Sequence, residues 1–378
     1  MQKNSKLSFI LFVIICFILI LYSIFAIYLH DPLQIWHKPF FRHEITYSKE
    51  IRESAKAMIR NEQFDSIIIG DSRSENISCK SAEKIFGGKF INLSISGSTL
   101  YEKNLILTYI LKRKKIKKVI FILDDFSVDL LVEPRMYNTK QYSFLYNDNL
   151  YDDYKIYLYD KYFYKTILLN NSKECIGEVL NMDRPFAWDE IPDFIDRFGG
   201  FENWIKCKDN EQIIDYFKLI LSTPQSINTN PLTNHYKERL AVFFNSYFFS
   251  NVSKERNTQF YLIISPVNEL ELARRIRAKN QFLAKQNEIL TYLVNIGLQY
   301  ENLKIFAFNN DPNLINIKDY KDGTHYTTSI SLYILESLNS NKYVINFSNL
   351  KKYIDDVNNI AVNFDYEYYY NQIKEAVK

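Results

Sequence analysis

Residues 66–74 read SIIIGDSRS, and the first five of them, SIIIG, decide the fold. A short run of branched apolar residues without polar alternation is typical of a strand that is buried on both faces, as the strands of a parallel sheet are. The glycine that ends the run permits a sharp turn. We therefore predict a buried strand followed directly by a tight turn that carries Asp71, Ser72 and Arg73.

The segments that follow this strand and precede it alternate between helix and strand patterns. We predict helices at 46–61, 79–86 and 100–114 and strands at 89–95 and 117–123. Thr99 and Glu102 have the spacing of a capping box, which marks the start of the third helix. Such alternation predicts an α/β fold built on a parallel sheet.

From about residue 129 to 255 the alternation stops. Tyr-rich and Asn-rich sequence with helical segments such as 211–221 predicts a largely helical insertion there. The strand pattern returns at 258–266 and 303–309, on either side of a long helical stretch at 269–297. We therefore divide the chain into 1–29 (cytoplasmic tip and transmembrane helix), 30–61 (juxtamembrane stalk and helix), 62–128 (first half of the core), 129–255 (insertion), 256–345 (second half of the core) and 346–378 (C-terminal tail).

The start of the chain predicts a membrane anchor. Residues 7–29 are uncharged and apolar, and at about 1.5 Å per residue they can cross a hydrocarbon layer of roughly 30 Å. Lys3 and Lys6 precede this run and no basic cluster follows it directly, so we expect a cytoplasmic N-terminus and an extracytoplasmic C-terminal domain. A cleaved signal peptide fits less well, because the run is too long and no A-x-A site follows. We expect a single-pass bacterial membrane protein that faces the periplasm or the cell surface.

Composition excludes several other classes of protein. The chain has 47 basic and 44 acidic residues and a formal net charge of +3, which gives no electrostatic reason to expect nucleic acid as a partner. Its four cysteines form no CxxC pair and no cluster with histidine, so we expect neither a metal ion nor a cofactor. Cys175 and Cys207 could form a disulfide in an oxidising compartment, although we favour free buried thiols.

Two short motifs carry residues suited to nucleophilic catalysis. Ser72 follows the buried strand, and the carboxyl ends of parallel strands are where ligands gather. A serine nucleophile needs a base, and of the five histidines only His235 and His325 lie beyond the juxtamembrane stretch. In the segment YKDGTHY, Asp322 lies three residues before His325, a spacing that lets the carboxylate fold back to Nδ1 while Nε2 faces the serine. Turns rich in Gly, Asp and Ser also occur for structural reasons alone.

Together these motifs resemble those of the SGNH/GDSL hydrolase superfamily, of the membrane-anchored type found in polysaccharide O-acetylation and teichoic-acid alanylation. The triplet GDS resembles the first block of the family, with Ser72 as nucleophile, and DGTH resembles the last, with Asp322 and His325 completing a triad. NLSISGSTLYE at 92–102 resembles the second block, which implies an oxyanion hole formed by the amides of Ser72 and Gly97. The implied fold is a three-layer α/β/α, flavodoxin-like parallel sheet.

One block departs from the family pattern. The third block normally presents an asparagine after a strand, whereas this chain reads FILDDFS at 121–127. An ionised Asp124 or Asp125 would repel an oxyanion, so that donor is either absent or replaced, for example by a main-chain amide. Loss of one such donor lowers the rate by about 10²-fold to 10³-fold. An active enzyme and a non-catalytic descendant both fit this pattern, and we favour the enzyme because the nucleophile, base and acid are all retained.

The resemblance implies an esterase or O-acyltransferase acting on acyl groups, chiefly acetyl, of cell-envelope polysaccharide. Transfer of the acyl group to water would make the protein an esterase, and transfer to a sugar hydroxyl an acyltransferase. The alternative is a non-catalytic protein of this fold that binds glycan or assembles with a membrane-bound acyltransferase. Arg73 would contact an anionic substrate or pair with Asp71 or Glu75. Trp188 and Trp204 would stack on sugar rings or, as we favour, pack the core of the insertion.

Overall fold

The computed structural model describes residues 2–42, 44–123, 139–206, 215, 232–278 and 282–376. The chain divides into two compact units. The first comprises Met1–Gln63 and Asn138–Asn181, and the second comprises Phe64–Tyr137 and Met182–Lys378. The predicted insertion therefore does not form a unit of its own, because its first part belongs with the N-terminal residues. The second unit contains the sheet and the residues of both motifs.

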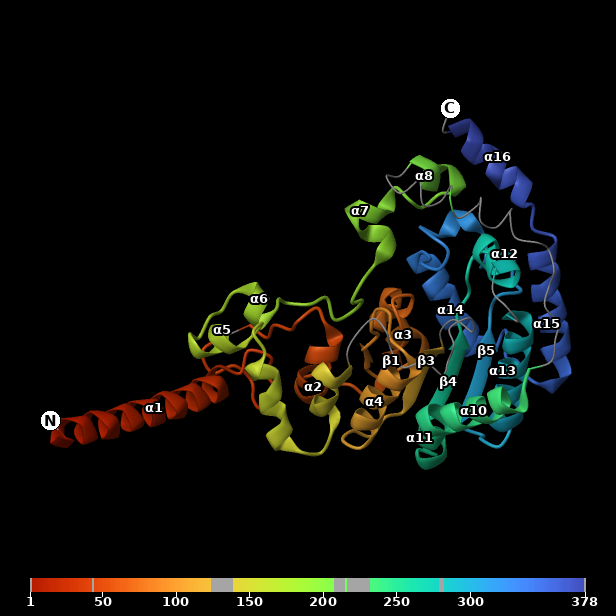
Figure 1. Cartoon of the computed structure of the whole chain (residues 1–378). Coiled ribbons are helices and arrows are strands. Elements are labelled where there is room, and N and C mark those ends of the chain that lie inside the picture. The colour runs from red at the N-terminus through yellow and green to blue at the C-terminus, as the bar shows by residue number, and fades with distance from the viewer. Residues whose placement is uncertain are drawn as a thin grey trace. The chain divides into compact units, whose positions relative to one another are not determined.

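The second unit is built on a five-stranded sheet in which every pair of neighbouring strands is parallel (Figure 1). Its strands are β1 (Ser66–Ile69), β2 (Phe90–Asn92), β3 (Lys118–Leu123), β4 (Gln259–Ile264) and β5 (Leu303–Ala307). The order across the sheet is β2-β1-β3-β4-β5. The predicted α/β class and the parallel sheet are confirmed. All four residues of β1 are buried, which explains why its sequence is a continuous apolar run.

Helices follow the strands where the sequence predicts them. The helices of the second unit are α3 (Cys79–Phe86), α4 (Leu100–Leu111), α7 (Pro192–Ile195), α8 (Phe201–Lys206), α10 (Asn234–Phe244), α11 (Ser250–Lys254), α12 (Glu269–Ala278), α13 (Phe282–Gly297), α14 (Thr328–Ser340), α15 (Phe347–Val362) and α16 (Tyr366–Ala376). The capping box at Thr99 and Glu102 is confirmed, since each residue's side chain accepts from the backbone N–H of the other. The predicted helix at 211–221 lies outside the described residues, apart from residue 215.

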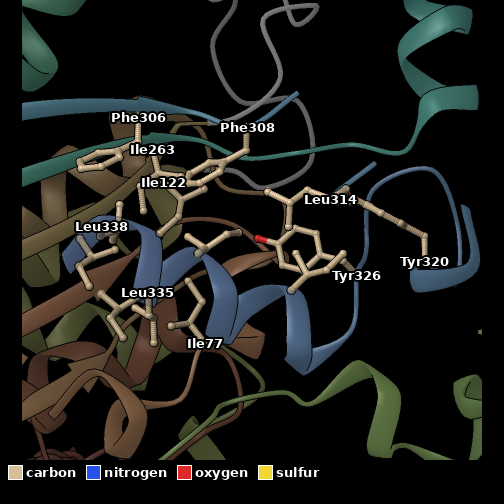
Figure 2. Close-up of a cluster of buried hydrophobic side chains, with 14 of the residues drawn as sticks. Ile77, Ile122, Ile263, Phe306, Phe308, Leu314, Tyr320, Tyr326, Leu335 and Leu338 are labelled. Atoms are coloured by element: carbon tan, nitrogen blue, oxygen red, sulfur yellow. The ribbon is translucent and has the colours of Figure 1, made fainter. Parts of the chain in front are cut away.

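The core of the second unit joins α3 and α14 to one face of the sheet (Figure 2). Alternate strand residues such as Ile122, Ile263 and Phe306 point to this face, where Leu335 and Leu338 of α14 meet them. The intervening residues point to the opposite face, where the ring centroid of Phe121 lies 5.0 Å from that of Phe248, in the π-helical turn Asn245–Phe249. Helical segments therefore bury both faces of the sheet.

The first unit begins with α1 (Gln2–His30), whose stretch Lys6–His30 is long and apolar enough to cross a membrane. Most of α1 is exposed, but Ala26 and Ile27 near its end are buried at 2% and 3% exposure. The hydroxyl of Tyr22 donates to the carbonyl of Ile167, in α5 (Phe163–Ile167), at 3.2 Å. The last two turns of α1 are therefore part of the folded unit.

The chain beyond α1 is folded rather than extended. Both carboxylate oxygens of Asp31 accept backbone N–H groups of residues 35–37, at 2.8–3.0 Å. The backbone donors of this loop beyond α1 are thereby satisfied. Further along, α2 (Ile51–Asn61) starts later than predicted, because the side chain of Glu50 accepts the N–H of Arg52 and caps it there. The remaining elements of the unit are the 3-10 helices Thr139–Gln141, Ser143–Tyr146 and Leu150–Leu158 and the helix α6 (Lys173–Ile176).

One buried ion pair links the two chain segments of the first unit. The ammonium of Lys56, on α2, donates to both oxygens of Asp153 at 2.6 Å, and Asp153 is completely buried. A buried pair of this kind is expensive to break, since removing one partner leaves an uncompensated charge and costs about 3–5 kcal/mol. Residues 138–181 are thereby fixed to residues before 63, although nearly a hundred residues separate them in sequence.

Candidate active site

Ser72 lies on a tight turn directly after β1. Gly70 begins this turn, and a Cβ at that position would lie 2.2 Å from Ser74 Oγ and 2.7 Å from Ile122 Cβ. Only glycine fits there without displacing its neighbours. The carbonyl of Asp71 accepts from both the N–H and the hydroxyl of Ser74, at 3.1 and 2.7 Å. The turn is thus closed by its own residues, and Ser72 is held at the carboxyl edge of the sheet.

The second motif folds into a loop stabilised by its own carboxylate. Tyr320 and Tyr326 form an antiparallel bridge, and the N–H of Lys321 donates to the carbonyl of His325 at 3.0 Å. Asp322 Oδ1 accepts the backbone N–H groups of Thr324 and His325, each at 2.9 Å. An aspartate that accepts N–H groups two and three residues ahead fixes the turn. The spacing Asp-Gly-Thr-His therefore sets the position of the imidazole.

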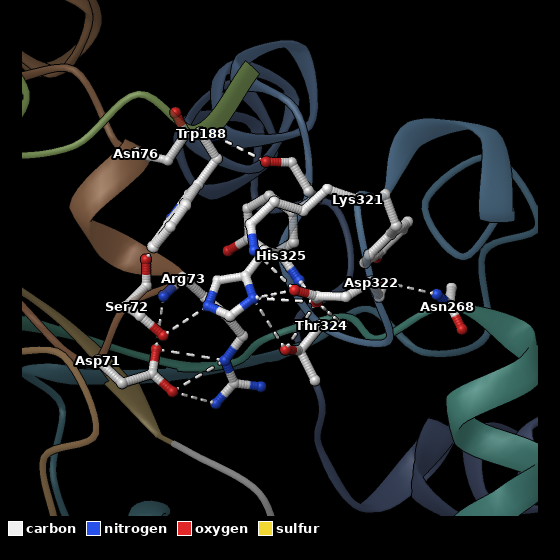
Figure 3. A network of polar contacts seen from close by, with 12 residues as sticks. Asp71, Ser72, Arg73, Asn76, Trp188, Asn268, Lys321, Asp322, Thr324 and His325 are labelled. Atoms are coloured by element: carbon white, nitrogen blue, oxygen red, sulfur yellow. Dashed lines mark hydrogen bonds and ion pairs between the residues drawn. The ribbon is translucent and has the colours of Figure 1, made fainter. Parts of the chain in front are cut away.

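The structure brings the two motifs together (Figure 3). His325 Nε2 lies 2.8 Å from Ser72 Oγ, and His325 Nδ1 lies 2.8 Å from Asp322 Oδ2 and 2.9 Å from Asp322 Oδ1. With the proton on Nδ1, the imidazole donates to the carboxylate and its Nε2 accepts the serine hydroxyl. This chain of hydrogen bonds lets the imidazole remove the proton from Ser72 as the oxygen attacks, while Asp322 stabilises the resulting imidazolium.

Asp322 is flanked by Lys321 as well as by His325. Lys321 Nζ lies 2.7 Å from Asp322 Oδ2, and it also lies 4.5 Å from the ring centroid of Trp188. Burial opposes ionisation of the carboxyl, but the hydrogen bond and charge of His325, followed by those of Lys321, outweigh it and hold the pKa of Asp322 well below its usual range. The carboxylate is therefore negatively charged under ordinary conditions, as support of an imidazolium requires.

Trp188 contacts two members of this hydrogen-bonded chain, Ser72 and His325. Its Nε1–H donates to the main-chain carbonyl of Ser72 at 2.8 Å, and its ring centroid lies 4.5 Å from that of His325 (Figure 3). The sequence predicted Trp188 only as a core or stacking residue of the insertion. No local signal could have found this role, because the contact joins residues 116 positions apart. Trp204 instead donates to the carbonyl of Tyr320 at 3.0 Å and lies in the hydrophobic core.

Arg73 pairs with Asp71, the second of the alternatives that the sequence left open. Its Nη2 lies 2.6 Å from Asp71 Oδ2, and its Nε lies 2.9 Å from the same oxygen. Arg73 is 4% exposed, so its guanidinium is not presented to solvent. The suggestion that Arg73 contacts an anionic substrate therefore needs correction, because the ion pair already turns the side chain inward and braces the turn.

The loop that carries Gly97 is fastened to the Ser72 turn. The carbonyl of Gly70 accepts from the N–H of Ile95 at 2.9 Å and from the hydroxyl of Ser98 at 3.0 Å. Gly97 lies between these two residues, is exposed, and has a φ of +62°. Within the part of the chain that the structure describes, the amide N–H groups of Ser72 and Gly97 have no acceptor. Neither donor is therefore engaged by another of the described residues.

Other candidate residues lie elsewhere or outside the described residues. Asp124 and Asp125 of the third block and Cys207 lie outside the described residues. Cys175 has a free, buried thiol. His235, the other candidate base, is exposed at the start of α10. No group of three or more His, Cys, Asp or Glu side chains that could hold a metal ion occurs among the residues described.

No protein-family model matches the chain, and the searches of curated proteins and of solved structures each give no match. A functional assignment must therefore come from the geometry of the site and from the sequence motifs that form it.

Proposed function

We propose that this protein is a membrane-anchored serine hydrolase or acyltransferase of the SGNH type, acting on acyl esters of cell-envelope polysaccharide. The observation that carries the proposal is the continuous hydrogen-bonded chain from Ser72 Oγ through the imidazole of His325 to the carboxylate of Asp322. Ser72 and His325 are 253 residues apart in the sequence. Their alignment with each other and with Asp322 is the arrangement of nucleophile, base and acid that nucleophilic catalysis requires.

In the proposed reaction Ser72 Oγ attacks the ester carbonyl carbon as His325 Nε2 accepts its proton. The carbonyl oxygen becomes an oxyanion, and the amides of Ser72 and Gly97 are the candidate donors to it. The carbon–oxygen bond to the leaving alcohol then breaks, and that alcohol takes the proton from the imidazolium. The acyl group remains on Ser72 until water or a sugar hydroxyl, deprotonated by the same imidazole, releases it.

The strand order supports an SGNH-type fold for the second unit. The sheet runs β2-β1-β3-β4-β5, the flavodoxin-like order of doubly wound α/β sheets, in which ligands bind beyond the carboxyl ends of the strands. Ser72 follows β1 at that edge, and helices bury both faces, as a three-layer α/β/α fold requires. Fold likeness alone does not identify a reaction. It supports the proposal only together with the triad geometry.

We also propose that α1 anchors the protein in the cell membrane as a single span. Lys3 and Lys6 lie on one side of the apolar run, which supports a cytoplasmic N-terminus and an extracytoplasmic active site. Acylated polysaccharide is the substrate available on that side of the membrane. A membrane-bound acyltransferase that supplies acyl groups is a suitable partner if the acceptor is a sugar hydroxyl.

The alternative function is a non-catalytic glycan-binding or assembly protein. It is favoured by the absence of an asparagine in the segment FILDDFS, which removes one expected oxyanion donor. Under this alternative the triad residues would be retained for their structural hydrogen bonds, and Ser72 would not react with electrophiles.

A fluorophosphonate probe separates the two functions, because it forms a covalent bond only with an activated serine. We expect the full-length protein in detergent to be labelled, the Ser72→Ala variant to be unlabelled, and the Ser329→Ala variant to be labelled as the wild type. Ser329 is the matched control, since it is exposed on α14 and lies outside the triad. Absence of labelling in a correctly folded wild-type protein would overturn the proposed chemistry.

A further inference from the structure

A cavity lies at the carboxyl edge of the sheet, apart from the triad. It has a volume of about 600 Å³ and is bounded by the start of α12, the loop after β5 and the junction of α15 with α16. The residues that matter for its chemistry are Glu269, Asn316, Phe364, Asp365, Tyr368 and Tyr369. Nothing in the triad chemistry uses this cavity.

The cavity is structurally coupled to the triad loop. Asn268 Nδ2 donates to the carbonyl of Asp322 at 2.9 Å, and the N–H of Asn268 donates to the carbonyl of Gly323 at 3.2 Å. The next residue, Glu269, lines the cavity, and its N–H donates at 2.8 Å to the carbonyl of Ile315, which also lines it. One short segment therefore holds the Asp322 turn and forms the wall of the cavity.

Aromatic rings form one side of the cavity. The rings of Phe364 and Tyr369 are stacked, with centroids 5.0 Å apart and planes 6° from parallel. Tyr368 lies edge-on to Tyr369 and is 56% exposed, so a large part of its ring faces solvent. Exposed aromatic faces beside a shallow cavity suit the apolar C–H faces of sugar rings, whose hydroxyls then need polar partners nearby.

The charge of the lining excludes anionic ligands. Glu269 and Asp365 are the charged residues of the lining, which includes no lysine or arginine. Burial raises the pKa of Glu269, while Tyr369 donates its hydroxyl to that carboxylate at 3.4 Å. Carboxylates and the amides of Asn316 and Asn363 offer hydrogen-bonding groups for sugar hydroxyls or amines, and they would repel a uronic acid or a phosphate.

We infer that this cavity binds a neutral or amine-bearing sugar unit of the polysaccharide whose acyl group reacts at Ser72. The inference rests on the proposed function, and it narrows the substrate to glycans without a negative charge on the bound unit. The aromatic rings supply contact area, the polar side chains orient the sugar, and the Asn268–Glu269 segment links occupancy to the position of the Asp322 turn.

Direct binding to the full-length Ser72→Ala protein tests this site without turnover. Suitable probes are hexamers of N-acetylglucosamine, of glucosamine and of galacturonate, measured by calorimetry in lauryldimethylamine oxide, because a maltoside detergent would itself present a sugar. We expect the N-acetylglucosamine hexamer, the glucosamine hexamer or both to bind, and the galacturonate hexamer to bind at least tenfold more weakly. Tyr368→Ala should weaken the binding at least tenfold, whereas Tyr151→Ala, at a residue 89% exposed in the first unit, should not.

Binding of galacturonate as tight as that of the other hexamers, no binding of any neutral or amine-bearing hexamer, or no effect of Tyr368→Ala would each overturn the inference. Hydrolysis of p-nitrophenyl acetate tests the reaction at Ser72 separately from sugar binding. That small ester does not need the cavity, and the wild-type protein and Tyr151→Ala should cleave it at the same rate. Cleavage of the ester without binding of any sugar hexamer would contradict the sugar site but not the proposed hydrolase. Sugar binding without ester cleavage or fluorophosphonate labelling would contradict the proposed hydrolase but not the sugar site.

Discussion

At the scale of single residues, Asp322 is placed to fix one tautomer of His325. Both its oxygens lie within 2.9 Å of Nδ1. An asparagine there presents an N–H group as readily as an oxygen, so the imidazole can place its proton on Nε2, where it cannot accept one from Ser72. We expect Asp322→Asn to lower the rate of fluorophosphonate labelling by about 10⁴-fold. A decrease below tenfold in a folded variant would show that Asp322 does not orient the base.

The same carboxylate predicts a pH dependence of stability. Because the pKa of Asp322 is lower in the folded protein than in the unfolded chain, its ionisation stabilises the fold at pH values above about 3.9. The contribution is lost as the pH falls from there towards the folded-state pKa. We expect the difference in melting temperature between wild type and Asp322→Asn to shrink as the pH is lowered below about 4, as measured by differential scanning fluorimetry.

Trp188 predicts a smaller effect on the nucleophile. Replacement by phenylalanine removes the Nε1–H donor to the carbonyl of Ser72 and keeps an aromatic ring beside His325. We expect Trp188→Phe to reduce labelling about tenfold, which corresponds to one hydrogen bond of roughly 1.4 kcal/mol. Trp36→Phe, in the first unit, is the control and should react at the wild-type rate. Equal rates for both variants would assign Trp188 a packing role alone.

At the scale of elements, α14 joins the triad loop to the core, because it starts three residues after His325. Leu335 is completely buried against the sheet, whereas Leu332, on the same helix, is 41% exposed. We expect Leu335→Ala to lower the free energy of unfolding by about 2–5 kcal/mol and Leu332→Ala by less than about 0.5 kcal/mol, measured by urea denaturation. Similar losses for the two variants would contradict the packing described.

The strands were predictable to within a few residues, because β1 is wholly apolar and β3 and β4 are buried and apolar after their first residue. The boundaries of the helices were less predictable. The predicted helical stretch 269–297 contains α12, which ends at Ala278, and α13, which begins at Phe282, with residues 279–281 outside the described residues. Helix α14 was not predicted, because its Thr, Ser, Ile and Tyr residues have low helix propensity and packing decides its conformation.

The residues of the candidate site were likewise predictable only in part. Ser72, Asp322 and His325 could be named from sequence because each lies in a short motif whose spacing sets its own turn. The contact of Trp188 with Ser72 could not, since only tertiary packing brings those segments together. The aromatic cavity was equally hidden, because its rings lie in the C-terminal tail, whose chemistry no motif indicates.

At the scale of the whole molecule, α1 is both the candidate anchor and a part of the first unit. A shortened protein that begins at residue 31 lacks Ala26, Ile27 and the Tyr22 hydroxyl, all of which contact the unit. We expect hydrogen exchange of residues 139–181 to be faster in that form than in the full-length protein. A variant in which residues 8–18 are replaced by leucine keeps those contacts and should exchange at the wild-type rate. Equal exchange in all three would show that α1 is only a tether.

The division of the chain has a consequence for the order in which the protein is made. The first unit needs Asn138–Asn181, and the buried pair of Lys56 with Asp153 joins this segment to the N-terminal one. During synthesis, β1, β2 and β3 emerge before that segment does. The edge of β3 therefore stays unpaired until β4 has been made, which happens after the last residues of the first unit. A factor that shields exposed strand edges during synthesis would consequently raise the yield of folded protein.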